Sequence, residues 1–135
     1  MILLSVDPGV VNIGYCVSMV DPEYQFMEYG VFNCSGEGAN YTEKLDDETN
    51  RCLVFFTELF DRWSFTHVAW ELPPSFGGMG QQTRILSNVT ALKVLTWQRE
   101  VYFDCFTPIA MKKRFTGDSK AEKSAIRDEV IKRWP

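Results

Sequence analysis

The sequence predicts a single α/β domain with a mixed five-stranded sheet and helices on both of its faces. Its 135 residues are enough for one hydrophobic core and short for two. Hydrophobic residues make up 45% of the chain and charged residues 24%, a composition that excludes a disordered chain. Five short apolar segments have the character of strands, and helical patterns separate the later ones, which favours parallel crossover connections.

The first predicted strand ends in an acidic residue. Ile2–Val6 is a nearly continuous apolar run, as expected for a strand that is buried on both faces of a sheet. Asp7 follows, and Pro8 and Gly9 then turn the chain toward a second apolar run, Ile13–Val20. A carboxylate at the end of a central strand is a common catalytic or metal-binding group in α/β proteins. Capping of the turn is the simpler alternative for this residue.

A third strand and a helix complete the first half of the chain. Tyr24–Phe32 is rich in aromatic and β-branched residues, so we expect it to extend the first two strands into an antiparallel meander. Cys52–Trp63 carries apolar residues at helical spacing. The acidic residues before this pattern favour a helix N-terminus, and we expect them to be a solvated helix entry without a catalytic role. They are Glu43, Asp46, Asp47 and Glu48.

A second strand that ends in an acid follows the helix. His67–Trp70 leads into Glu71, and Leu72–Pro74 ends the strand. Crossover rules place this strand parallel and adjacent to the first, so Asp7 and Glu71 should emerge side by side. Two facing carboxylates repel each other and bind Mg²⁺ or Mn²⁺ when the cation relieves the repulsion. We therefore predict a metal site at Asp7 and Glu71; for Glu71, an ordinary surface acid is the alternative.

The segment Gln81–Gln98 is predicted to be a helix with apolar residues on more than one face. One face can pack on the sheet, so the other needs a different cover, and we predict a homodimer that forms through this helix. A fifth strand follows at Val101–Phe106.

The last quarter of the chain is basic, although the whole chain has a net charge of −4. Pro108–Pro135 contains eight Lys and Arg against four Asp and Glu, whereas the rest of the chain contains six against fourteen. A local basic surface can bind phosphate whatever the total charge, because the field near a surface depends on charge placement.

This basic segment is predicted to form a short element from Pro108, a turn at Thr116–Asp118 and a final helix. Ser119 and Glu122 have the spacing of a capping box, which predicts the start of that helix. The helix would then carry Lys120, Lys123 and Arg127 on one face. A lysine-bearing helix N-terminus is a ready site for phosphate, with a solvated helix face as the alternative.

The cysteines lack the paired spacing of a zinc site or a disulfide framework. They are Cys16, Cys34, Cys52 and Cys105. This usage predicts reduced, mostly buried thiols in an intracellular protein that is not secreted. No apolar segment is long enough to span a bilayer, and the apolar N-terminus, interrupted by Asp7, lacks the basic leader of a secretory signal.

Three blocks of the sequence resemble the RuvC-type Holliday junction resolvases, which are ribonuclease H-like endonucleases. The family's first motif is similar to SVDPGVVNIGY, which contains Asp7. Its second acidic motif is similar to HVAWELPP, an apolar strand that ends in Glu71. Its basic segment is similar to PIAMKKRFTGDSKAEKSAI, with matching positions at Lys112, Gly117, Lys120, Ala121 and Lys123. The blocks occur in family order and span most of the chain.

The resemblance implies a Mg²⁺-dependent, structure-selective endonuclease that resolves four-way DNA junctions. Two cations, Mg²⁺ or Mn²⁺, would bind in each active site, with Asp7 bridging both and Glu71 holding at least one. In this family an aromatic residue shortly after the second acid wedges against the junction. Phe76 is the candidate here, although the two prolines before it change the spacing, and a phenylalanine packed on the core is the alternative. The expected DNA contacts are Lys112, Lys113, Arg114, Lys120, Lys123, Arg127 and Phe76.

One part of the family's pattern is missing from this sequence. The family completes the site with further acids, or a histidine and an acid, on a helix that should follow near Pro135, and Asp128 and Glu129 are poor substitutes. We expect residues 1–135 to be one ribonuclease H-like nuclease domain, truncated at its C-terminus, that binds junctions and cuts them slowly or not at all.

Other functions stay open at this point. One is a catalytically impaired branched-DNA-binding domain of the same fold, and another is a ribonuclease H-like nuclease that acts on another nucleic acid. A sugar-kinase-like or actin-like phosphate-binding module is disfavoured because the second glycine-rich phosphate loop is missing.

Overall fold

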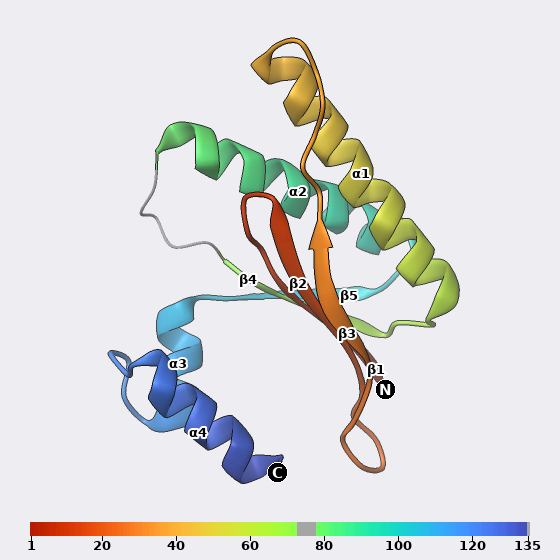
Figure 1. Ribbon diagram of the computed structural model, residues 1–135. Helices are drawn as coiled ribbons and strands as arrows, with labels where there is room; N and C mark the ends of the chain where they lie inside the picture. The colour runs from red at the N-terminus through yellow and green to blue at the C-terminus, as the bar shows by residue number, and fades with distance from the viewer. Residues whose placement is uncertain (73–77, 135) are drawn as a thin grey trace.

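The computed structural model describes residues 1–72 and 78–134. The strands are β1 (Ile2–Asp7), β2 (Asn12–Met19), β3 (Gln25–Asn33), β4 (His67–Glu71) and β5 (Tyr102–Phe106). The helices are α1 (Tyr41–Arg62), α2 (Met79–Gln98), α3 (Pro108–Thr116) and α4 (Lys123–Arg133). Figure 1 shows α1 and α2 on one side of the sheet and α3 and α4 on the other. None of the helices in the described ranges is long and apolar enough to cross a membrane.

The five strands form one mixed sheet in the order β3-β2-β1-β4-β5. The first three pair antiparallel as a meander, whereas β4 pairs parallel to β1, and β5 parallel to β4. The predicted α/β architecture with a mixed five-stranded sheet is therefore confirmed. Because β1 is the central strand, between β2 and β4, its last residue lies in the middle of the sheet edge that is formed by the strand ends.

The main core lies between the sheet and the α1–α2 layer. Alternate residues of the central strands point into it, and Leu4, Ile13 and Trp70 have no exposed surface. Helices α1 and α2 contribute the opposing side chains, Cys52, Phe56, Leu59, Val89, Leu92 and Leu95. Each fully buried aliphatic or aromatic side chain stabilises the fold by roughly 1.5–3 kcal/mol relative to exposure. This layer therefore supplies most of the apolar burial of the domain.

The acidic residues in the first half of α1 are exposed or partly exposed as predicted, except for Glu48. The helix begins at Tyr41, and the side chain of Asn40 caps it by accepting a hydrogen bond from the Glu43 amide at 3.0 Å. Glu48 thus lies inside the helix, is buried and forms an ion pair with Arg84 of α2. The expectation that the whole acidic cluster is solvated is wrong for Glu48, because an arginine from a second helix compensates its burial.

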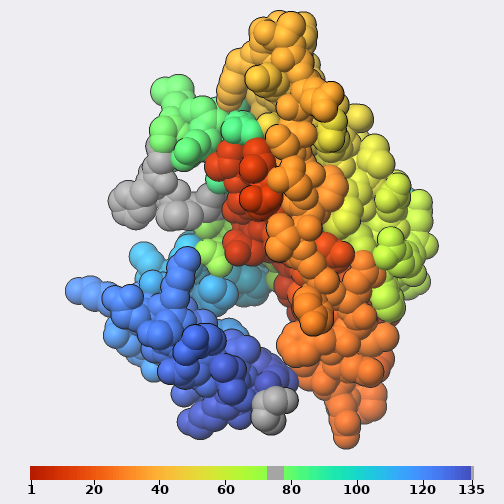
Figure 2. Space-filling model, viewed as in Figure 1, coloured from red at the N-terminus to blue at the C-terminus, as the bar shows by residue number. Residues whose placement is uncertain are grey.

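The other face of the sheet is covered only in part. Helices α3 and α4 pack against each other, and the Trp134 ring, just after α4, lies 5.2 Å from the Tyr24 ring, measured between centroids. Figure 2 shows an opening between the α4 region, drawn in blue, and the first strands, drawn in red and orange. The α3–α4 pair therefore covers only part of this face of the sheet.

The predicted capping box of the last helix is wrong. Helix α4 begins at Lys123, and its N-cap, Glu122, makes no capping hydrogen bond through its side chain. Ser119 and Lys120 belong to the preceding turn, where the side chain of Asp118 accepts a hydrogen bond from the Lys120 amide at 2.9 Å. The Asp118 side chain holds this segment in a turn, and the helix starts after Glu122 in place of Ser119, so Lys120 does not share a helical face with Lys123.

Candidate functional site

The candidate site is built from the ends of two neighbouring parallel strands. The β1–β4 register pairs Val6 with Trp70, and both side chains are buried, with 5% and 0% of their surface exposed. Asp7 and Glu71 each follow one of these residues. Because side chains alternate along a strand, both acids point to the opposite face, away from α1 and α2. The predicted juxtaposition of the two strand ends is confirmed.

The turn after Asp7 is held tightly by the rest of the fold. A Cβ atom at Gly9 would lie 2.0 Å from the Asn12 carbonyl oxygen, so the turn needs glycine at this position. Cys34, just after β3, donates its amide to the Val11 carbonyl at 2.8 Å. The end of the third strand thereby fixes the turn, which keeps the Asp7 carboxylate in place.

The charges of Asp7 and of two lysines affect the ionisation of Glu71. Burial, followed by the negative charge of Asp7, raises the pKa of the Glu71 carboxyl, whereas the positive charges of Lys123 and Lys112 lower it. An acid whose ionisation is opposed by a second carboxylate is a common feature of functional sites. Asp7, Lys112 and Lys123 therefore all lie within electrostatic range of the Glu71 carboxyl.

The donor set suits a hard divalent cation. Carboxylate oxygens are the ligands that Mg²⁺ and Mn²⁺ prefer, and a bound cation would remove the repulsion between Asp7 and Glu71. Within residues 1–72 and 78–134, no group of three or more His, Cys, Asp or Glu has a metal-binding arrangement. Asp128 pairs with Arg127 at 3.5 Å, and Glu129 pairs with Arg133 at 3.6 Å. The described residues thus offer two carboxylates to a cation, and neither acid of α4 is a third.

The remaining basic residues lie on α3, on α4 and in the turn between them. Lys113 and Arg114 are exposed in the last turn of α3, and Lys120 is exposed in the turn before α4. Arg127 is exposed on α4. These residues therefore come from two helices and their connection, and the predicted shared helical face of Lys120, Lys123 and Arg127 is wrong for Lys120. Phe76, the predicted aromatic wedge, lies outside the described residues.

An aromatic residue beside Glu71 was missed in the sequence. The β4–β5 register pairs Glu71 with Phe106, and residues paired in this way point to the same face of a sheet. Phe106 is 41% exposed, unlike the half-buried Cys105 before it. The signal available in the sequence was its place as the last residue of the fifth strand, where a side chain reaches the same edge as Asp7 and Glu71.

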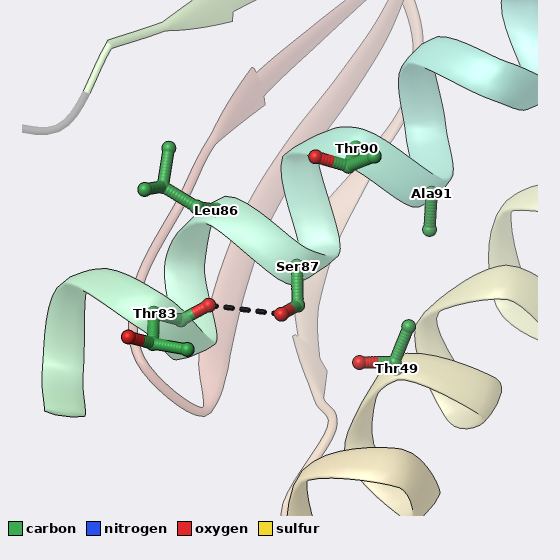
Figure 3. Close-up of a pocket in the computed structure, with 6 residues that line it drawn as sticks. All are labelled: Thr49, Thr83, Leu86, Ser87, Thr90 and Ala91. Carbon is green, nitrogen blue, oxygen red and sulfur yellow. Dashed lines mark hydrogen bonds between the residues drawn. The ribbon is translucent and has the colours of Figure 1, made fainter.

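The outer face of α2 carries the second apolar surface that the sequence predicted. Leu86, Val94 and Trp97 are exposed there, Trp97 by 69%. An open hollow of about 460 Å³ lies between this helix and α1, lined by Thr49, Thr83, Leu86, Ser87, Thr90 and Ala91. Figure 3 shows that the Ser87 hydroxyl is turned back onto its own helix, where it donates to the Thr83 carbonyl at 2.9 Å. The exposed residues of α2 on this surface are uncharged, and the half-buried Lys93 lies at its border. The surface belongs to the α1–α2 layer, not to the face that carries the acids.

No protein-family model and no curated protein matches this sequence. Among solved structures, the RuvC structure from Thermus thermophilus matches with a TM-score of 0.79 and 18% identity, covering 96% of this chain and 78% of RuvC. The same protein in complex with a Holliday junction substrate gives a TM-score of 0.79 and 18% identity over 96% of this chain and 77% of that one. The yeast mitochondrial Holliday junction resolvase Ydc2 matches with a TM-score of 0.65 and 12% identity, covering 97% of this chain and 63% of Ydc2. The chain therefore has the α/β, ribonuclease H-like fold that these resolvases share.

Proposed function

We propose that this chain is the nuclease domain of a Mg²⁺-dependent, structure-selective endonuclease that binds and resolves four-way DNA junctions. The observation that carries the proposal is that the strands ending in Asp7 and Glu71 pair side by side, with Lys112 and Lys123 close enough to affect the ionisation of Glu71. The fold supports it, because a solved structure with a TM-score of 0.79 to this chain holds a Holliday junction substrate.

The proposed chemistry assigns separate tasks to the acids and the lysines. Asp7 and Glu71 would hold the Mg²⁺ or Mn²⁺ ions, and a pair of such ions would supply an activated water and stabilise the leaving oxygen of a phosphodiester. Lys112 and Lys123 neutralise negative charge next to the acids, which allows a phosphate to approach them. Lys113, Arg114, Lys120 and Arg127 extend positive charge away from the site, along the path that we assign to the DNA backbone.

A second candidate function is branched-DNA binding with little or no cleavage. It is favoured because the described residues group no third metal-binding side chain with Asp7 and Glu71. A cation held by too few ligands stabilises the transition state less, and each 1.36 kcal/mol lost lowers the rate tenfold. We therefore expect residues 1–135 to bind junctions tightly and to cut them slowly or not at all.

The proposal includes a homodimer that forms through the outer face of α2. Leu86, Val94 and Trp97 are exposed, and the exposed α2 residues around them carry no charge, although Lys93 borders them half-buried. Two copies can therefore face each other across a two-fold axis with little repulsion between like charges. The Thr83 and Ser87 hydroxyls bond to their own helix, which allows dry packing of the surface. Sedimentation should report a dimer that W97E converts to a monomer, whereas V31E, on the exposed face of β3, should leave it intact. A monomeric wild-type chain at high concentration would exclude this arrangement.

The metal assignment is tested by thermal melting without DNA. In a chelator, E71Q should melt at a higher temperature than the wild-type chain, because it removes one of two repelling carboxylates. Added Mg²⁺ should raise the melting temperature of the wild-type chain more than that of E71Q, since a ligand that binds only the folded state stabilises it. E58Q, a neutralised exposed acid of α1, should respond to Mg²⁺ as the wild-type chain does. If Mg²⁺ does not change the melting temperature of the wild-type chain, the proposed metal site is excluded.

The junction assignment is tested by a paired gel assay. A four-way junction and a linear duplex of matched sequence are titrated with the chain in Ca²⁺ or chelator, and cleavage is then followed in Mg²⁺ and Mn²⁺. We expect tighter binding to the junction, with an affinity that falls steeply as salt is raised. Equal affinity for the two DNAs would exclude the junction proposal, and rapid Mg²⁺-dependent cutting would exclude the impaired alternative.

A further inference from the structure

An exposed aromatic side chain adjoins the acids on the open face of the sheet. Phe106 is the last residue of β5, and the strand register pairs it with Glu71. Neighbouring strands lie about 4.8 Å apart, and paired residues point to the same face of the sheet. The Phe106 ring is therefore a direct neighbour of the Glu71 side chain. Since 41% of its surface is exposed, a molecule that is bound at the acids can reach it.

The backbone is fixed on both sides of Phe106. Its carbonyl accepts a hydrogen bond from the Leu72 amide at 2.7 Å, which continues the pairing of β4 with β5 to the edge of the sheet. Directly after it, the Thr107 side chain caps α3 by accepting a hydrogen bond from the Ala110 amide at 3.2 Å. The ring thus projects from a hydrogen-bonded corner between the edge that carries the acids and the helix that carries Lys112.

The Phe106 ring differs from other exposed aromatic rings of the sheet in having no partner. The Tyr102 ring, on the same face of β5, lies 5.3 Å from the His67 ring, measured between centroids. The Tyr24 ring lies 5.1 Å from the Phe26 ring in the same measure. Within residues 1–72 and 78–134, no aromatic ring and no Lys or Arg side chain stacks on Phe106. The face of this ring is therefore open to a ligand.

We propose that Phe106 is a specificity-determining residue, which stacks on an unpaired DNA base beside the phosphate held at Asp7 and Glu71. The inference rests on the proposed function, because that function places the reacting phosphate at the two acids. A phenyl ring has no charge and no hydrogen-bonding group for a phosphate, but it offers an apolar face to any base. The bases of a linear duplex are stacked on one another, so only an unpaired base presents its face to the ring.

This contact would make the edge that carries the acids selective for DNA with unpaired bases. The acids and the lysines recognise phosphate, which every DNA presents, so they carry no information about branching. One base stacked on an aromatic side chain typically adds about tenfold or more in affinity. In this structure that gain would go to a junction whose bases open at the branch point, and a linear duplex would not receive it.

The test is a binding cycle that combines a protein variant with abasic DNA. A four-way junction is made with and without the bases that flank its branch point, and is titrated in Ca²⁺ with the wild-type chain and with F106A. F106A should bind the intact junction about tenfold more weakly than the wild-type chain and should bind a linear duplex equally well. Loss of the bases should weaken binding by the wild-type chain and leave F106A unchanged, because both changes remove one contact.

Three further variants control the cycle, and melting curves check that each one is folded. Y102A removes an exposed ring from the same face at the other end of β5, and it should bind both junctions as the wild-type chain does. F106W keeps an aromatic face and should retain junction affinity, whereas F106L lacks one and should bind as F106A does. Losses that add in the cycle, equal losses of F106A on junction and duplex, or full affinity of F106L would overturn the proposal.

Failure of the junction proposal would give a different result. The wild-type chain would then bind the junction no better than the duplex, and the cycle is repeated on a duplex with a short single-stranded bulge, with and without the unpaired bases. A preference for the unpaired bases that F106A abolishes would support the stacking role. A preference that F106A retains, or no preference, would overturn it, and absence of binding to all of these DNAs would overturn both proposals.

Discussion

The two faces of the sheet differ in packing and in the residues that they present. On the α1–α2 face, alternate strand residues such as Leu4 and Val68 are almost fully buried. On the other face, Tyr29, Val31 and Tyr102 are 76%, 70% and 60% exposed. The acids at the ends of β1 and β4 belong to this more open face.

The difference shows how one strand can serve stability and function together. Val6 and Asp7 are neighbours in β1, yet one packs in the core and the other is exposed at the site. Strand alternation produces this division directly. Substitutions on the packed face should therefore change the free energy of unfolding, and substitutions on the open face should change DNA chemistry with little effect on folding.

The largest expected effect is on the open face, at Asp7. D7N should lower the rate of junction cleavage by about three orders of magnitude, equivalent to ~4 kcal/mol of transition-state stabilisation, because it removes a proposed metal ligand. Its melting temperature in chelator should not fall. D46N, at an exposed position of α1, should cut at the wild-type rate. Where wild-type cleavage is too slow to follow, the loss of Mg²⁺-induced thermal stabilisation in D7N is the readout, and unchanged Mg²⁺ binding would contradict the assignment.

The next effect belongs to the packed face. L92A in α2 should lower the free energy of unfolding by about 3 kcal/mol, because it leaves a cavity at a fully buried position. L53A, at an exposed leucine of α1, should change it by less than about 0.5 kcal/mol. Urea unfolding measures both values, and junction affinity of the folded L92A chain should stay at the wild-type level. Weaker DNA binding by folded L92A would mean that the two faces are coupled.

Removal of the two site lysines tests the open face without touching the acids. K112A/K123A should weaken junction binding about tenfold or more and reduce the slope of log affinity against log salt by about 2, since each phosphate contact contributes close to one unit. K44A/K132A removes the same charge from exposed positions elsewhere and should leave the slope unchanged. Equal losses of junction affinity in the two double variants would mean that Lys112 and Lys123 act only through the net charge of the chain.

The smallest effect concerns Glu28, on the packed side of edge strand β3. Its carboxylate accepts hydrogen bonds from the Trp63 Nε1 atom at 2.9 Å and from Arg62, at the end of α1. The bond from Trp63 is the largest cause of a lowered pKa at Glu28. E28Q should cost about 1 kcal/mol of unfolding free energy at neutral pH, whereas E23Q, at an exposed position, should cost nothing measurable.

The pH dependence of this loss follows from the direction of the shift. A carboxyl group with a lowered folded-state pKa stabilises the fold above its ordinary value of 4.5, and this contribution is lost as pH falls through the folded-state pKa. The difference in melting temperature between wild type and E28Q should therefore be full at neutral pH and shrink below that value. A difference that grows on acidification would contradict the assigned interaction.

Local patterns in the sequence were sufficient for the elements and for the acids at their ends. Apolar runs bounded by proline, glycine and acidic residues located all five strands to within about two residues, and the crossover rule placed β4 beside β1. The prediction failed at Ser119 and Glu122, because the Asp118 side chain holds the backbone in a turn at Lys120 and the helix starts only after Glu122. That failure moved Lys120 off α4, so it does not share a helical face with Lys123 and Arg127 as predicted.

The sequence by itself determined the period and burial of each segment, and with them the strand-end positions of Asp7 and Glu71. Only the tertiary structure decided which distant side chains meet: Lys112 and Lys123 near Glu71, Phe106 beside it, Arg84 on Glu48, and Asn88 against Cys34. The physical reason is that alternation along a strand and spacing along a helix are local properties of the chain. Contacts between separate elements depend instead on strand register and on how whole helices pack, which no short stretch of sequence specifies.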